Sequence, residues 1–145
     1  MTKFFYGADK KGKLVRDKIA QDTLKEGHKV QSRKIAGDEL LRELLKKFRE
    51  ELGELENAFS AKNPDDEKAE IADLQTLLDA YIRTRGFDEC EIDQIKQRKI
   101  AKKGGFDKGS FIEWVDLKPD AENYDFWLNY FRENAERYPE EKEAK

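Results

Sequence analysis

The chain has 145 residues, of which 42% are charged and 37% are hydrophobic, and its formal net charge is −3 at pH 7. This length predicts one main domain, and the hydrophobic fraction is well above the composition typical of disorder. Acidic and basic residues are interleaved, which disfavours a nucleic-acid-binding surface. A single cysteine, Cys90, excludes an internal disulfide and a zinc site built from several thiolates. No apolar run is long enough for a signal peptide or a membrane span, so we expect a cytoplasmic protein without membrane contact.

The first part of the chain predicts an extended entry, a short helix and a strand. Residues 13–28 favour a helix of about three turns, near residues 16–26, because apolar positions recur at helical spacing and Gly27 stands near the end. Residues 30–35 suit a short strand, and residues 106–117 suit another that can pair with it. The sequence therefore predicts at most one small β-hairpin in a helical protein.

Two long amphipathic helices are predicted over residues 38–60 and 64–85. Asp38 is a suitable N-cap for the first, since its carboxylate can accept hydrogen bonds from free backbone N–H groups. Asn63 is the expected cap of the second, with Pro64 at its first helical position and acidic residues in its first turn. The connection between the helices is short, so we expect them to pack antiparallel.

Two further helices are predicted after Gly86, which ends the second long helix. One covers residues 88–103, and another, rich in aromatic residues, lies within residues 119–138. We interpret the aromatic face as a packing face or a subunit contact. The expected fold class is all-α, with a main domain over residues 1–117 and a C-terminal helical extension over residues 118–145 whose charged tail frays.

Carboxylates lie beside the apolar stripe of each long helix. On a helical wheel, Glu51 and Glu54 lie about 70° and 130° from the centre of the first stripe, on one flank. Glu70 and Asp73 lie about 55° and 115° from the centre of the second, on a flank of the same hand. Antiparallel packing brings such flanks to one side of the pair, where four carboxylates can line a groove that suits Mg²⁺. The first stripe consists of Leu41, Leu45, Phe48, Leu52, Leu55 and Phe59, and the second of Ile71, Leu74, Leu78, Tyr81 and Ile82.

Spacing alone leaves a simpler interpretation open. Acidic pairs three residues apart are about as common here as expected for helices rich in glutamate. Solvated helix flanks carry such pairs too, with partners four residues away such as Lys47. The choice between a metal site and a solvated flank therefore depends on the wider sequence context.

The order of the acidic residues provides part of that context. Glu50, Glu51 and Glu54, followed by Glu70 and Asp73, form the pattern E-E-x-x-E…E-x-x-D. This pattern resembles the metal-binding signature of the all-α nucleoside triphosphate pyrophosphatases, the MazG-like superfamily. The resemblance implies a helical bundle as the fold.

Two further motifs resemble one subgroup of that superfamily, the phosphoribosyl-ATP pyrophosphohydrolase-like proteins. "KLVRDKI" at residues 13–19 is similar to the subgroup's opening segment, and "KKGGF" at residues 102–106 is similar to its closing segment. Ala20 stands where the subgroup usually has proline, which is favoured but not required at a helix start. The C-terminal helix lies outside the pattern.

The resemblance implies Mg²⁺-dependent hydrolysis of a nucleoside triphosphate, or a related nucleotide, to the monophosphate and pyrophosphate, with Mn²⁺ as a substitute ion. It implies Glu51, Glu54, Glu70 and Asp73 as the metal ligands. One carboxylate orients or deprotonates the attacking water, and Glu50 and Glu51 are the candidates. The wheel places Glu50 away from the apolar stripe, so its predicted role is beside the metal or at a partner subunit.

The triphosphate also requires cations from the protein. Lysines in the last turn of a helix also stabilise the helix by complementing its dipole, so this structural role remains an alternative for the basic residues before the double glycine. The candidate phosphate-binding residues are Arg16, Lys18, Arg98, Lys99, Lys102 and Lys103.

The resemblance further implies a homodimer or higher homo-oligomer. Two alternatives remain: a different nucleotide substrate, or a helical interaction module without catalysis.

Overall fold

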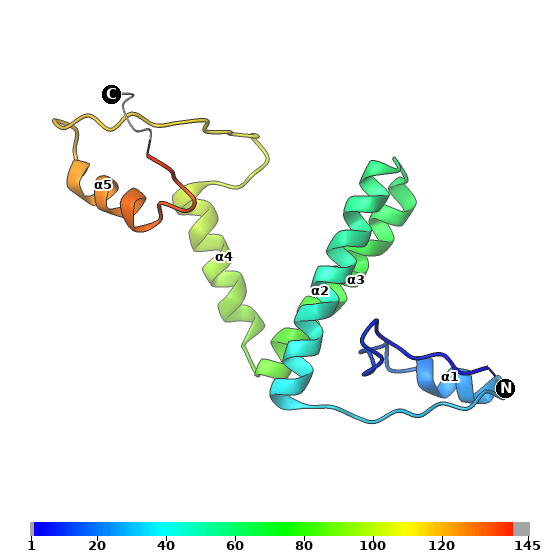
Figure 1. Ribbon diagram of the computed structural model, residues 1–145. Coiled ribbons are helices and arrows are strands. Elements are labelled where there is room, and N and C mark those ends of the chain that lie inside the picture. The colour runs from blue at the N-terminus through cyan, green and yellow to red at the C-terminus, as the bar shows by residue number, and fades with distance from the viewer. Residues whose placement is uncertain (1, 141–145) are drawn as a thin grey trace. The chain divides into compact units, whose positions relative to one another are not determined.

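The computed structural model of the chain describes residues 2–140, and within that range it shows five helices and no strand. The predicted all-α class is confirmed, and none of the described helices is long and apolar enough to cross a membrane. Two compact units, Met1–Lys102 and Lys103–Lys145, make up the chain, where the sequence placed its boundary after residue 117. The helices are α1 (Ile19–Lys25), α2 (Gly37–Ser60), α3 (Pro64–Arg85), α4 (Glu89–Lys103) and α5 (Tyr124–Glu133) (Figure 1).

The segments before α2 differ from the prediction. The first helix covers only Ile19–Lys25, and Lys18 at its N-cap position makes no side-chain capping hydrogen bond. The predicted strands at residues 30–35 and 106–117 are wrong, since both segments are irregular. An isolated two-stranded pairing is marginally stable at best, and these segments belong to different units. The tail predicted to fray includes residues 141–145, which lie outside the described residues.

The start of α2 also differs slightly. The helix begins at Gly37, and the N-cap position is taken by Ala36 in an extended conformation without a side-chain cap. Asp38 is therefore not the N-cap but a residue of the first turn, where its negative charge still favours the helix dipole.

The turn into α3 forms as the sequence predicts. The Asn63 side chain accepts a hydrogen bond from the backbone N–H of Asp66 at 3.3 Å, and Pro64 occupies the first helical position. At the other end Gly86 adopts a left-handed conformation with φ of 67°, and its N–H donates to the carbonyls of Ile82 and Arg83. These two ends fix the length of α3 and direct it back along α2.

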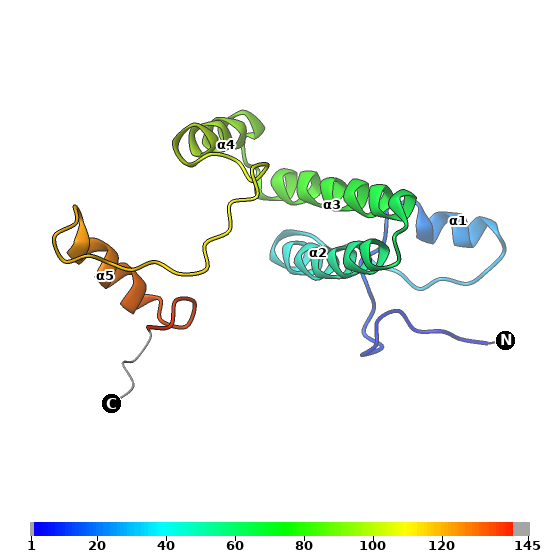
Figure 2. The same ribbon diagram turned by 90° about the horizontal axis from the view of Figure 1, so that it is seen from above.

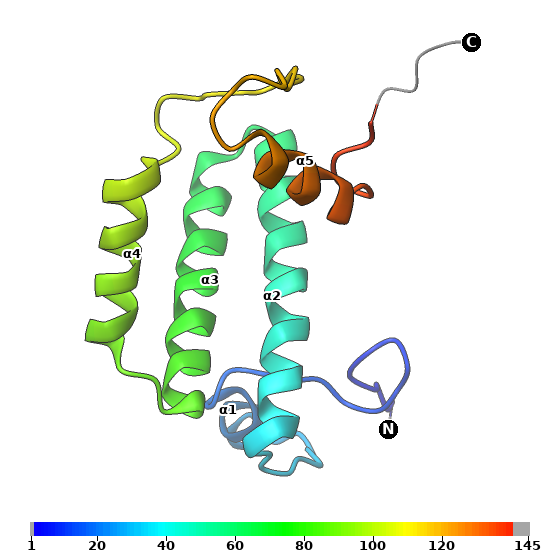
Figure 3. The same ribbon diagram turned by 90° about the vertical axis from the view of Figure 1, so that its left-hand side faces the viewer.

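Helices α2 and α3 lie side by side and antiparallel, as both Figure 2 and Figure 3 show. Among residues 2–140 the buried residues are Leu44, Ala58 and Ile82, together with one carboxylate, Glu51. This pair of helices is therefore the packed centre of the first unit, and a charged residue belongs to its small core.

The buried face of α2 is rotated from the predicted stripe. Leu45, Leu52 and Phe59 are 43%, 50% and 71% exposed, although the sequence placed them in the stripe. Glu51, expected at the edge of the buried face, is only 6% exposed. The physical reason is that a single helix, α3, covers only one side of the broad apolar surface of α2, so the other side stays exposed.

The Asn63 cap provides a test of the helical hairpin. We expect Asn63→Ala to lower the free energy of unfolding by about 1 kcal/mol, because the first turn of α3 loses a side-chain acceptor. Urea unfolding followed by circular dichroism measures the change. Asn57→Ala, an exposed position within α2, is the matched control and should be neutral or slightly stabilising. Equal effects at both positions would contradict a capping role for Asn63.

Candidate metal centre

Three carboxylates from two helices meet between α2 and α3. One oxygen from each of Glu51, Glu70 and Asp73 lies within 4.8 Å of the others. Glu51 comes from the middle of α2, whereas Glu70 and Asp73 stand three residues apart on α3 and so share a face. Three of the four ligands implied by the resemblance are thus brought together by the antiparallel packing.

Glu70 is the least satisfied of these groups. Its Oε2 atom is buried and has no hydrogen-bond partner among the described residues. Burial raises the pKa of Glu70, and the contact with Glu51 and the charges of Glu54, Glu51 and Asp73 raise it further. A buried anionic oxygen without a partner is costly, and oxygen ligands at this spacing fit a hard cation such as Mg²⁺. The donor set therefore fits the metal that the sequence implies.

Glu54, the fourth implied ligand, lies at the edge of the cluster. It is exposed and is not one of the three converging carboxylates. Nevertheless, partial loss of hydration and the charges of Glu51 and Glu50 raise the pKa of Glu54. It thus lies within the electric field of the cluster, and its role as a ligand stays a prediction.

Basic side chains contact the carboxylates from two directions. The Arg16 guanidinium, from the segment before α1, forms an ion pair with Asp73. Lys47 Nζ lies 2.5 Å from Glu51 Oε1 and 3.1 Å from Glu50 Oε1. Burial would lower the pKa of Lys47, but the contacts with Glu51 and Glu50 outweigh burial and raise it. The cluster is therefore partly neutralised by the protein's own cations.

Glu50 contacts lysines rather than the carboxylate cluster. Lys13 Nζ lies 2.5 Å from Glu50 Oε1, and Lys47 approaches the same oxygen. The hydrogen bond from Lys13 lowers the pKa of Glu50, and the contact with Lys47 lowers it further. The sequence reasoning missed Lys13, and it considered Lys47 only as a partner on a solvated flank. The signal for Lys47 was its position three and four residues before two consecutive glutamates.

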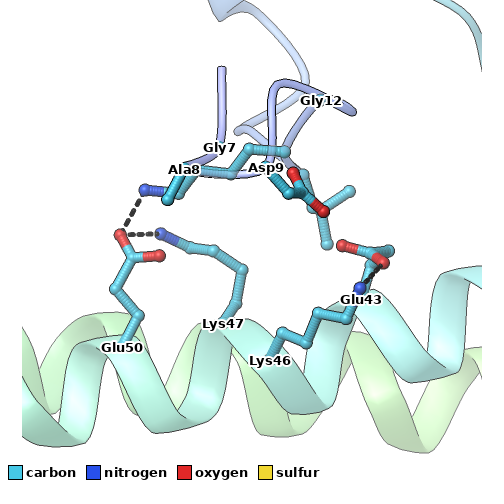
Figure 4. A pocket seen from close by; sticks show the side chains of 10 residues that line it. Gly7, Ala8, Asp9, Gly12, Glu43, Lys46, Lys47 and Glu50 are labelled. Carbon is cyan, nitrogen blue, oxygen red and sulfur yellow. Dashed lines mark hydrogen bonds and ion pairs between the residues drawn. The ribbon is translucent and has the colours of Figure 1, made fainter. Parts of the chain in front are cut away.

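A pocket of about 270 Å³ lies beside the contacts of Glu50 with Lys13 and Lys47. It lies between the N-terminal loop and α2, and Figure 4 shows Lys47 and Glu50 reaching toward this loop. The pocket contains as many acidic as basic side chains, so its charges balance. Its lining consists of Gly7, Ala8, Asp9, Gly12, Lys13, Leu14, Glu43, Lys46, Lys47 and Glu50.

The remaining candidate phosphate-binding residues are not brought to the cluster by any described contact. Lys18 is exposed at the start of α1. The four basic residues of α4 are also exposed, and no ion pair or hydrogen bond within residues 2–140 joins them to the carboxylates. Their roles stay predictions. These four residues are Arg98, Lys99, Lys102 and Lys103.

Comparisons of the chain with protein-family models, curated proteins and solved structures give no match.

The burial and charge repulsion that raise the pKa of Glu70 predict that the stability of the protein depends on pH. In EDTA at pH 7, we expect Glu70→Gln to raise the free energy of unfolding, because a neutral amide removes the repulsion that raises the pKa of Glu70. The gain should shrink as the pH falls toward 4.5, the ordinary carboxyl value, since the wild-type Glu70 then also becomes neutral.

Urea unfolding at pH 7, 6 and 5 measures this difference. The control is Glu56→Gln, an exposed glutamate of α2, which should show no gain that depends on pH in this way. A Glu70→Gln protein that is less stable than wild type at every pH would contradict a strained carboxylate cluster.

Proposed function

We propose that this chain is a Mg²⁺-dependent nucleotide pyrophosphohydrolase, which converts a nucleoside triphosphate or related nucleotide to the monophosphate and pyrophosphate. The observation that carries the proposal is the convergence of Glu51, Glu70 and Asp73, with one buried glutamate oxygen left without a partner. The order of these residues supports it, since it resembles the signature of the MazG-like superfamily.

Carboxylates from both helices would hold the metal: Glu51, Glu70 and Asp73, with Glu54 at the edge. When bound, Mg²⁺ would supply charge neutralisation at the phosphates and activation of water. Phosphoryl transfer depends on positioning and electrostatic stabilisation more than on covalent chemistry. A site without a cysteine, histidine or serine nucleophile is thus adequate for this reaction.

Cations beside the carboxylates support a phosphate-containing substrate. Arg16 contacts Asp73 of the cluster, and Lys13 contacts Glu50, the residue before Glu51 on α2. A guanidinium offers several N–H donors that match phosphate oxygens in pairs. We propose that Arg16 and Lys13 bind the phosphates of the nucleotide. Glu50, beside the cluster, is the candidate that orients the attacking water.

Pyrophosphate release tests this proposal directly. The protein is assayed with ribo- and deoxynucleoside triphosphates in the presence of Mg²⁺, Mn²⁺ or EDTA. Metal-dependent formation of monophosphate and pyrophosphate is expected, and the ranking of substrates then identifies the base and sugar. Absence of hydrolysis across the panel, with folded protein that does not bind metal, would contradict it.

A ligand variant sharpens the test. We expect Glu51→Gln to reduce metal-dependent hydrolysis by roughly 100-fold or more, because metal stabilisation of the reacting charges is worth several kcal/mol. Glu56→Gln lies on the same helix but outside the cluster, and should retain activity. Circular dichroism confirms that both variants are folded. Full activity of Glu51→Gln would show that Glu51 is not a metal ligand.

A second candidate function is a helical interaction module without catalysis. It is favoured by the large exposed side chains of the second unit, which include Phe106, Phe111 and Trp114. The two functions differ in their response to metal. A ligand that binds only the folded state raises the melting temperature, so Mg²⁺ stabilises the enzyme but leaves an interaction module unchanged.

We also propose that the first unit assembles into a homodimer or higher homo-oligomer through an apolar face of α2 and α3. Leu45, Leu52 and Phe59 recur every seven residues on α2, and Ile71 and Leu78 do the same on α3, all of them exposed. A seven-residue apolar repeat is typical of helix–helix seams. On α2 this repeat lies about 100° around the helix from Glu51, so a second copy can cover it without covering that carboxylate.

A charge placed in this apolar face tests the assembly. We expect Leu52→Lys to weaken self-association, because the lysine would be buried without a partner in the interface. Sedimentation equilibrium over a range of concentrations measures the change. Leu24→Lys, at a leucine of α1 with similar exposure, is the control and should assemble as the wild type does. A wild-type protein that is monomeric throughout would contradict the proposed interface.

A further inference from the structure

Lys47 on α2 contacts two successive glutamates of the same helix, Glu50 and Glu51. Its Nζ lies 2.5 Å from Glu51 Oε1 and 3.1 Å from Glu50 Oε1. The Lys47 side chain is 20% exposed and that of Glu51 is 7% exposed, so their ion pair is largely shielded from water. Figure 4 shows the contact between Lys47 and Glu50. An ion pair in such a setting fixes side-chain geometry more firmly than one on an open surface.

We propose that Lys47 is a positioning residue of the metal centre, which holds the Glu51 carboxylate in the orientation that metal binding requires. The proposal rests on the proposed function, since it deepens the role of the same site. In this role Lys47 acts through Glu51 and is not itself a metal ligand, because an ammonium group has no lone pair to offer a cation.

Like charges make such a residue necessary. Glu51 faces Glu70 and Asp73 at distances below 4.8 Å, so repulsion favours any rotamer that turns Glu51 away from them. A glutamate has several rotatable bonds, and the ion pair with Lys47 restricts them. The contact runs from Lys47 Nζ to Glu51 Oε1, one of the two carboxylate oxygens.

Glu50 and Lys13 extend this arrangement toward the N-terminal segment. Glu50 Oε1 lies near both Lys47 and Lys13, so Lys47 has a second acidic partner besides Glu51. The resulting chain of contacts, Lys13–Glu50–Lys47–Glu51, connects the segment before α1 to the carboxylate cluster. In this arrangement Glu50 fixes the residue that orients Glu51.

An alternative role for Lys47 is that of a simple counter-charge, and the two roles predict opposite results. A positive charge near a cation site weakens cation binding, so removing a mere counter-charge would strengthen the binding of Mg²⁺. Removing a positioning residue weakens binding instead, because Glu51 is no longer held in place. Loss of such supporting partners commonly reduces metal affinity by about 10- to 100-fold.

The test uses the full chain with Lys47→Met, Lys47→Arg and a matched control, Lys68→Met. Lys68 pairs with Asp65 on an exposed turn of α3, so this control loses an ion pair away from the cluster. Isothermal titration with MgCl₂ gives the dissociation constant, and the Mg²⁺-induced shift in melting temperature provides an independent readout. We expect Lys47→Met to raise the dissociation constant by about tenfold or more, and Lys47→Arg to restore most of the loss. Lys68→Met should bind as the wild type does.

Binding of Mg²⁺ by Lys47→Met that is as tight as in the wild type, or tighter, would overturn the positioning role alone. A wild-type protein without any response to Mg²⁺ would overturn the metal site and, with it, the role of Lys47. If Lys47→Met does not fold, Lys47→Gln, which keeps a polar end on a side chain of similar shape, is judged by the same criterion.

Discussion

Repulsion among carboxylates held between two packed helices is the constraint on which the rest of the first unit depends. Packing α2 against α3 buries Glu51 beside Leu44 and Ala58 and brings it to Glu70 and Asp73. Buried like charges oppose folding, so apolar contacts, opposite charges or a bound cation must offset them. The small apolar core leaves much of that task to the cations.

Basic residues around the cluster offset part of the repulsion among the carboxylates. Lys47 comes from the same helix as Glu51, whereas Arg16 and Lys13 come from the segment that precedes α1. These contacts tie an otherwise irregular segment to the helical pair. They also place positive and negative side chains next to each other in the site. Such a mixture suits a metal-bound phosphate, because carboxylates can hold the metal ion while basic residues contact the phosphate oxygens.

The sequence was most informative where local rules act alone. Pro64 and Gly86 placed the ends of α3 correctly because a first-turn proline and a left-handed glycine depend only on neighbouring residues. Local rules did not predict features that depend on contacts between residues far apart in the sequence. Residues 30–35 are irregular rather than a strand, and α2 begins at Gly37 rather than after an Asp38 cap.

Chain order and spacing by themselves determined that two long helices fold back on each other, and that Glu51, Glu70 and Asp73 lie on flanks that can meet. Periodicity marks a broad apolar surface on each helix, but it does not say which part of that surface a single partner helix covers. Only the tertiary structure decided which side of α2 is covered, and hence that Glu51 is buried while Leu52 is exposed. It also decided that Arg16 contacts Asp73, because these residues are far apart along the chain and only the packing brings them together, whereas the contact of Lys47 with Glu51 follows from a spacing of four residues on one helix.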